Sequence, residues 1–261
     1  MDESVLHQLT LWFRSYVDGF RDENAALHPM MEFKLGHTAR VAVFSRTIAE
    51  QSDWSVQQAN LAEVGGWLHD VGRFSQWADF ATYRDGASVD HAARGHDVLS
   101  EHAPLHIVAQ PERAHLLESV ALHNRLALPD TLDVGSRRLC ELVRDADKLD
   151  IFDVIYGHLS EGNLGEVVPR LSSKPEANPV MLEEIRTTHR ASYSNIRTQA
   201  DYVLVSVAWA YDLSFRATAK LARQKDVLSR LAPFLPDTPE VRAVVDDAVD
   251  HLREVVESDA C

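Results

Sequence analysis

The sequence contains a histidine–aspartate doublet, His69-Asp70, within the glycine-punctuated stretch Gly65 to Arg73. Adjacent residues of a helix point about 100° apart, so the doublet cannot chelate a single ion from one helix face. It can instead spread around a cluster, because a carboxylate bridges two ions while the neighbouring imidazole completes the coordination of one. Six of the thirteen histidines lie between His91 and His123. Together these residue types favour a metal centre with nitrogen and oxygen ligands.

The elements that must hold these residues are predicted to be helices. Glycine accounts for 11 of 261 residues, below its usual share of about 7%. Apolar residues recur at helical spacing after His37, at Val41, Phe44 and Ile48. A helix is expected to end at the doublet, with Gly72 in the left-handed conformation of a helix terminus. Because no segment alternates like a strand, we predict an all-α fold.

The chain is predicted to form one all-α domain over residues 1–261. Its core spans about residues 30–160, and its C-terminal helical extension spans about residues 178–258, after a loop at 157–179 rich in glycine and proline. Residues 180–232 contain neither glycine nor proline, which predicts two long helices. Thr238 is the expected N-cap of a final helix.

Five segments of the chain, taken in order, resemble the HD-domain superfamily of metal-dependent phosphohydrolases. The resemblance is to the version that carries a second pair of histidines, and it covers roughly residues 30–160. A bare His-Asp pair is a weak signal, whereas five ordered blocks on helical segments are a strong one. The segments are KLGH (34–37), WLHDVGRF (67–74), VDHAARG (89–95), LHN (122–124) and VRDADKLD (143–150). The resemblance implies an HD-domain helical bundle.

The resemblance also implies a ligand set for two divalent ions. The first would be held by His37, His69, Asp70 and Asp147, and the second by Asp70, acting as a bridge, with His91 and His123. Imidazole and carboxylate ligands suit Mn, Fe, Co, Ni or Zn, whereas Mg²⁺ seldom uses four histidines. Two such ions about 3.5–4 Å apart lower the pKa of a bridging water and hold the attacking and leaving oxygens of a phosphoryl group.

Three cationic side chains near these ligands are candidates for contact with phosphate. Arg73 lies one turn past the doublet, and Arg125 lies two residues after His123, so either could clamp phosphate oxygens. Lys148 adjoins Asp147 and could neutralise charge or orient that carboxylate.

Two of the ligand positions have competitors nearby. His96 lies five residues after His91. We prefer His91, because the HD pattern places this ligand at the start of a helix, four residues before a glycine. Asp145 competes with Asp147, which is preferred because Asp145 is expected to point closer to solvent. Asp150 is assigned to a solvated face.

Composition excludes several classes of partner. The chain has 26 basic and 40 acidic residues, a formal net charge of −14, so its surface should repel nucleic-acid polymers and anionic lipids. The longest nearly uncharged apolar run, about residues 202–211, is shorter than a membrane helix. The acidic start lacks the basic region of a signal peptide, so a cytoplasmic location without membrane partners is expected. The two cysteines, Cys140 and Cys261, form no disulfide framework and no zinc–thiolate pattern.

Three classes of function remain. The leading hypothesis is a phosphohydrolase, either a phosphomonoesterase or a phosphodiesterase, acting on a small phosphorylated metabolite or nucleotide. The same ligand set also resembles that of HD-fold di-iron oxygenases, from which the identity of the metal would distinguish it. A third class is a non-catalytic sensor or interaction protein with a structural metal. The amphipathic C-terminal helices could pack on the domain or form the seam of a homodimer.

Overall fold

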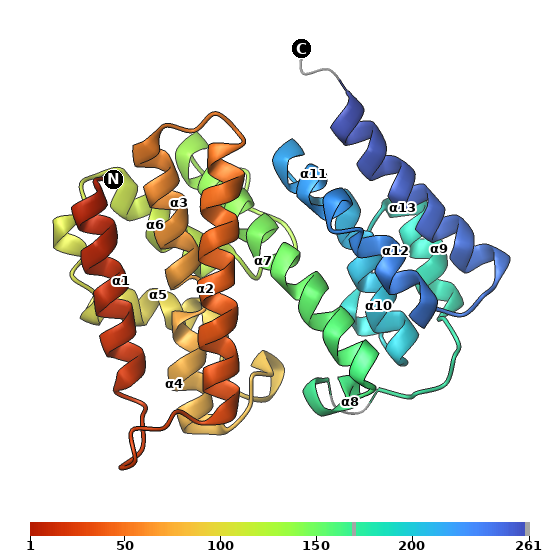
Figure 1. Ribbon diagram of the computed structural model, residues 1–261, viewed down its shortest axis with the longest axis horizontal. Coiled ribbons are helices and arrows are strands. Elements are labelled where there is room, and N and C mark those ends of the chain that lie inside the picture. Colours follow the sequence, from red (N-terminus) through yellow and green to blue (C-terminus); the bar gives the residue numbers. More distant parts are fainter. Residues whose placement is uncertain (169–170, 259–261) are drawn as a thin grey trace. The chain divides into compact units, whose positions relative to one another are not determined.

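The computed structural model describes residues 1–168 and 171–258 (Figure 1). Over these residues the chain is built from helices, and its one isolated bridge, Ser172 with Thr198, forms no strand. The prediction of an all-α fold is confirmed. Cys261, which closes the predicted 1–261 span, lies outside the described residues.

The helices group into two compact units, Met1–Asp147 and Lys148–Cys261. The boundary falls within helix α7, and the interpretation as one domain stays a prediction. The elements of the first unit are α1 (Glu3–Asp18), α2 (Pro29–Glu50), α3 (Val56–Leu68), α4 (Val71–Phe80), η1 (Asp85–Ala87), α5 (His91–His102), η2 (Leu105–Ile107), α6 (Glu112–Leu122) and the first half of α7 (Val134–Glu161).

The core of the first unit lies between α2 and α3, which run side by side (Figure 1). Gly66 permits this approach, because a Cβ atom there would come 2.6 Å from the Cα atom of Ala42. Helix α1 covers α3 with the fully buried Phe13, whose ring lies 5.8 Å from those of both Trp67 and Phe74. Helices α4, α5 and α6 then pack in succession. Helix α3, which packs against α1, α2 and α6, is therefore buried at most positions between Ala59 and Leu68.

The His-Asp doublet occupies the turn between α3 and α4, since α3 ends at Leu68 and α4 begins at Val71. The prediction for Gly72 is wrong: this residue lies inside α4 and does not have a positive φ. A Cβ atom at Gly72 would lie 2.3 Å from the carbonyl oxygen of His91 and 2.6 Å from the backbone nitrogen of Gly95. The glycine therefore serves the close approach of α4 to α5.

The second unit contains mostly short helices, with α13 the longest of those that lie wholly within it. They are the second half of α7, α8 (Leu164–Val167), α9 (Pro179–Thr188), η3 (Tyr193–Asn195), α10 (Gln199–Ala208), η4 (Trp209–Asp212), α11 (Arg216–Gln224), α12 (Val227–Leu231), η5 (Ala232–Phe234) and α13 (Pro239–Glu257). The loop predicted at 157–179 begins later in the structure, because α7 continues to Glu161. The loop also contains the short helix α8.

The prediction of two long helices in residues 179–232 is wrong. His189, with φ of 56°, ends α9, and Asp226, with φ of 51°, separates α11 from α12. Both breaks use the left-handed conformation without glycine. The predicted N-cap of α13 is confirmed, because the Thr238 side chain accepts a hydrogen bond from the backbone nitrogen of Val241 at 3.3 Å. Among the described residues, none of the helices combines the length and apolar character needed to cross a membrane.

Candidate metal centre

Six side chains from separate parts of the first unit converge on one point. Five of them are buried, with exposed fractions of 6% or less, and the sixth, Asp147, has a side chain that is 21% exposed. The six come from the middle of α2 (His37), the turn between α3 and α4 (His69 and Asp70), the first residue of α5 (His91), the C-cap of α6 (His123) and the middle of α7 (Asp147).

The Asp70 carboxylate lies between two histidine pairs. Its Oδ2 atom is 3.6 Å from His37 Nε2 and 3.5 Å from His69 Nε2. Its Oδ1 atom is 3.4 Å from His91 Nε2 and 3.6 Å from His123 Nε2. Each oxygen thus belongs to its own triad of ligand atoms, in which all atoms lie within 4.8 Å of one another. This is the arrangement that a bridging carboxylate requires.

Asp147 offers a fourth ligand atom to the first triad. Its Oδ1 atom lies 3.1 Å from His37 Nε2 and 3.8 Å from His69 Nε2. Although the side chain is partly exposed, this oxygen is shielded from solvent and has no hydrogen-bond partner among the described residues. A buried carboxylate oxygen without a donor is costly unless a cation compensates it, so the atom fits a metal ligand.

Hydrogen bonds set the tautomers of three histidines. The Nδ1 atoms of His69 and His123 each donate to the backbone carbonyl three residues earlier, at 2.8 Å. His91 Nδ1 donates to Asp85 Oδ2 at 2.6 Å. In a ring whose proton is on Nδ1 alone, Nε2 carries the lone pair, yet the Nε2 atoms of His91 and His123 are only 3.0 Å apart. Two facing lone pairs repel each other unless a cation lies near both, which again fits a divalent ion.

The protonation states also suit metal binding. Burial lowers the pKa of His69 and of His91 to about 4, so both rings are neutral near pH 7. Burial would raise the pKa of Asp70, but the nearby charges of Lys34 and Arg73 hold it well below its usual value. His69, His91 and Asp70 therefore have their metal-binding forms without losing a proton.

The alternatives at the two contested positions lie elsewhere. The His96 side chain is 42% exposed and lies 3.3 Å from the Asp97 carboxylate, away from the cluster. The expectation that Asp145 and Asp150 face solvent is wrong, because both are buried, at 0% and 1% exposure. Burial alone therefore does not distinguish Asp147 from its neighbours, but the contact with His37 does.

The structure gives Arg73 and Lys148 protein partners. Arg73 is 15% exposed, and its Nη1 donates to the Tyr83 carbonyl at 2.6 Å and to Asp85 Oδ1 at 2.9 Å. Lys148, in the second unit, donates to the carbonyl of Asp212 at 2.9 Å and lies 2.7 Å from its carboxylate. Both side chains are bound to oxygen atoms of the protein. These contacts do not support the prediction that Arg73 and Lys148 bind phosphate.

Arg125 differs from these two cations. Its side chain is 48% exposed, and Nη2 donates to Asp90 Oδ2 at 2.8 Å. Asp90 is the N-cap of α5 and directly precedes His91, while Arg125 follows His123 by two residues. The guanidinium is therefore tethered beside the second triad while remaining accessible to solvent.

Two residues of the site were not singled out from the sequence. Lys34 Nζ lies 2.6 Å from Asp70 Oδ2 and 5.8 Å from the centre of the Tyr83 ring. Its position three residues before His37, on the same helix face, was an available signal. Asp85 lies in the η1 turn, where no periodicity indicates which way a side chain points.

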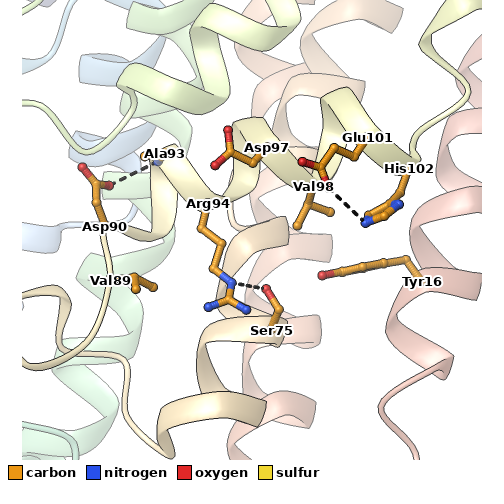
Figure 2. A pocket seen from close by; sticks show the side chains of 10 residues that line it. All are labelled: Tyr16, Ser75, Val89, Asp90, Ala93, Arg94, Asp97, Val98, Glu101 and His102. Atoms are coloured by element: carbon orange, nitrogen blue, oxygen red, sulfur yellow. Dashed lines mark hydrogen bonds and ion pairs between the residues drawn. The ribbon is translucent and has the colours of Figure 1, made fainter.

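A separate pocket lies on another face of α5 (Figure 2). Arg94 reaches across it from α5 to Ser75 Oγ at 2.6 Å, and Tyr16 of α1 forms part of the wall. Asp97 and Glu101 give it an acidic rim. None of the six candidate ligands is among the described residues that line this pocket, so it is distinct from the centre.

The buried histidines predict a pH-dependent stability of the metal-free protein. The unfolded chain takes up protons below a pKa of about 6.5, whereas folded His69 and His91 resist protonation down to about 4. Stability should therefore fall as pH decreases from 6.5 to 4, measured as the thermal midpoint in the presence of a chelator. The His96→Gln variant, outside the cluster, should follow the wild type. A level midpoint across this range contradicts the prediction.

Comparison with known families agrees with this geometry. Residues 35–155 match the family model described as HD domain, a range that contains all six converging residues. Among curated proteins and solved structures, none is significantly similar to the chain. The matched range is helical, as an HD domain is, and its buried His and Asp side chains fit the metal site of that family. Residues 35–155 are therefore similar to an HD domain in sequence, in their helical fold and in their converging His and Asp side chains.

Proposed function

We propose that this protein is a phosphohydrolase that acts on a small phosphorylated metabolite or nucleotide with two divalent transition-metal ions. The observation that carries the proposal is the position of Asp70, each of whose oxygens faces one histidine pair. A single structural ion would need only one closed set of ligands. Two triads that share one carboxylate favour a dinuclear centre, with Mn, Fe, Co, Ni or Zn as the candidate metals.

The residues of the site have two roles, since some would bind the metal ions and others keep Asp70 ionised. His37, His69, Asp70 and Asp147 would hold one ion, and Asp70, His91 and His123 would hold the other. Such a pair of ions activates water and stabilises the charge on a transferring phosphoryl group. Lys34 and Arg73 hold Asp70 in its ionised form from either side, with Lys34 Nζ at 2.6 Å and Arg73 Nε at 3.4 Å from its oxygens. Asp70 thus keeps both oxygens available as acceptors.

Arg125 is the residue that we propose binds the phosphate of the substrate. It is the more exposed of the two candidate arginines, and its bond to Asp90 leaves other guanidinium hydrogens able to donate. An arginine fork matches two phosphate oxygens at once. The strongly negative net charge of the chain favours small substrates over nucleic-acid polymers.

Replacing Arg125 should weaken substrate binding more than it slows the chemical step. For Arg125→Ala we expect KM for the best phosphorylated substrate to rise about tenfold, with kcat reduced by less than about threefold. Steady-state kinetics at saturating metal measure both constants. Arg94→Ala is the matched control, because Arg94 belongs to α5 itself and forms its ion pair with Asp79. An unchanged KM in Arg125→Ala contradicts the assignment.

The function as a whole is tested by metal content and product. Elemental analysis of the purified protein should find about two transition-metal ions per chain. With the matching metal, a panel of phosphorylated metabolites should yield inorganic phosphate or a phosphomonoester. Substrate-dependent oxygen uptake by an iron-loaded protein, without phosphate release, would instead identify an oxygenase. Unfolding that accompanies metal removal, with no turnover of any substrate, would identify a structural metal.

A further inference from the structure

The η1 turn places one carboxylate against three polar groups of the metal-centre region. Asp85 Oδ2 accepts a hydrogen bond from His91 Nδ1 at 2.6 Å. Asp85 Oδ1 accepts from Arg73 Nη1 at 2.9 Å and from Gln76 Nε2 at 3.0 Å. Gln76 is fully buried and also donates to the Val89 carbonyl at 3.0 Å. Both oxygens of Asp85 are therefore engaged, and the turn is fixed against α4 and the start of α5.

His91 depends on a side chain where the other assigned rings depend on the backbone. His69 and His123 donate Nδ1 to carbonyls of their own helices, which no substitution removes. His91 is the first residue of α5, so no preceding turn of that helix offers it a carbonyl. Asp85 takes that place. A carboxylate partner fixes the ring orientation of a histidine ligand and makes its other nitrogen a stronger donor to a metal.

A third ion is the competing explanation, since Asp85, Asp90 and His91 also offer ligand atoms close to one another. The hydrogen bonds argue against it. Asp90 Oδ1 already accepts from the backbone nitrogen of Ala92 and from Asn124 Nδ2, both at 3.0 Å. The proton between His91 Nδ1 and Asp85 would also have to leave before a metal could bind there. The contacts therefore favour a role for Asp85 in holding His91.

We propose that Asp85 is a positioning residue that sets the affinity of the second ion, the one assigned to Asp70, His91 and His123. It acts by holding His91 with a proton on Nδ1 and the lone pair on Nε2 directed at Asp70. This inference rests on the proposed dinuclear centre. It adds that the second ion depends on a side chain in the η1 turn, whereas His69, a ligand assigned to the first ion, is held by the backbone of its own helix.

The test is metal binding by the full chain without substrate. Metal-free wild type titrated with Mn²⁺ in a calorimeter should bind two ions. In Asp85→Asn the second ion should bind about 10- to 100-fold more weakly, while the first keeps its affinity. Asparagine preserves the shape of the side chain but has one acceptor oxygen, so it cannot serve His91 and the pair Arg73 and Gln76 together.

Asp90→Asn is the matched control, because it removes the same charge beside His91 yet retains a good N-cap. It should leave both affinities within about threefold of wild type. Equal weakening in Asp90→Asn would show a general charge effect and overturn the role of Asp85. Circular dichroism confirms that each variant is folded.

A measurement on the wild type keeps the inference testable if Asp85→Asn does not fold. Nitrogen-15 NMR of the metal-free protein should find His91 protonated on Nδ1, and a proton on Nε2 would overturn the proposal.

The outcomes of these experiments distinguish a failure of the proposed dinuclear centre from a failure of the role of Asp85. Fewer than two ions on the wild type contradict the proposed dinuclear centre. Two ions, with an unchanged second affinity in Asp85→Asn, contradict only the role of Asp85, and three ions, one of them lost in Asp85→Asn, favour the competing explanation.

Discussion

Asp70→Ala is expected to abolish metal retention and to reduce phosphate release by about 1,000-fold or more. Among the described residues, Asp70 is the one whose two oxygens face both histidine pairs, so its loss removes a ligand from each ion at once. It also leaves the partly buried ammonium of Lys34 without the carboxylate 2.6 Å away, a second reason for a large effect. Elemental analysis and steady-state kinetics measure the two losses.

Asp70→Asn controls for packing in this experiment. Asparagine fills the same volume but lacks the negative charge, so it should lose metal nearly as completely as alanine while remaining folded at neutral pH. Thermal unfolding followed by circular dichroism checks the fold. Full phosphatase activity in either variant contradicts the proposed function.

Gly72→Ala is expected to destabilise the protein by roughly 3 kcal/mol, although the change adds a single methyl group. The new Cβ atom would lie 2.3 Å from the His91 carbonyl oxygen and 2.6 Å from the Gly95 nitrogen. These are backbone atoms, which cannot rotate aside, so α4 and α5 must separate. Such a shift moves His91 relative to the doublet and should also weaken the binding of the second ion. Urea unfolding with and without metal measures both effects.

Gly157→Ala is the matched control for that substitution. Gly157 lies in α7, and among the described residues no neighbouring group comes within 4 Å of the place that an alanine methyl would occupy. Alanine should therefore stabilise this helix by up to about 1 kcal/mol. A Gly72→Ala protein within about 0.5 kcal/mol of wild type would show that α4 and α5 can separate freely.

The sequence was informative where helical spacing and motif order agreed. The helix of residues 29–50 carries His37 on the face that its apolar neighbours define, and its structure follows from that periodicity. His91 and His123 could be placed only through the resemblance, because the spacing between distant segments says nothing about their distance in space. The structure shows their Nε2 atoms 3.0 Å apart.

Other features depend on contacts that no local pattern encodes. Glycine occurs both at left-handed helix termini and where two helices pack closely. Only the packing of α4 on α5 shows that Gly72 serves a close helix contact. Asp145 and Asp150 look like solvated residues of an acidic helix but are buried. The breaks at His189 and Asp226 use left-handed residues other than glycine, which composition does not reveal. Asp85 belongs to a short turn without periodicity.

Lys34 and Arg73 offset most of the negative charge of the metal centre, so that bound metal would give it an electrical character opposite to that of the molecule around it. Without metal, the carboxylates of Asp70, Asp85 and Asp147 exceed these two cations by one charge, so the region is mildly negative. Two bound divalent ions would reverse its sign, creating a small positive well on a chain whose formal net charge is −14. A compact dianion would be drawn into that well, while a long polyanion would meet repulsion along the rest of its length. Added salt should therefore impede the capture of small phosphates, because it screens the attraction that guides them inward.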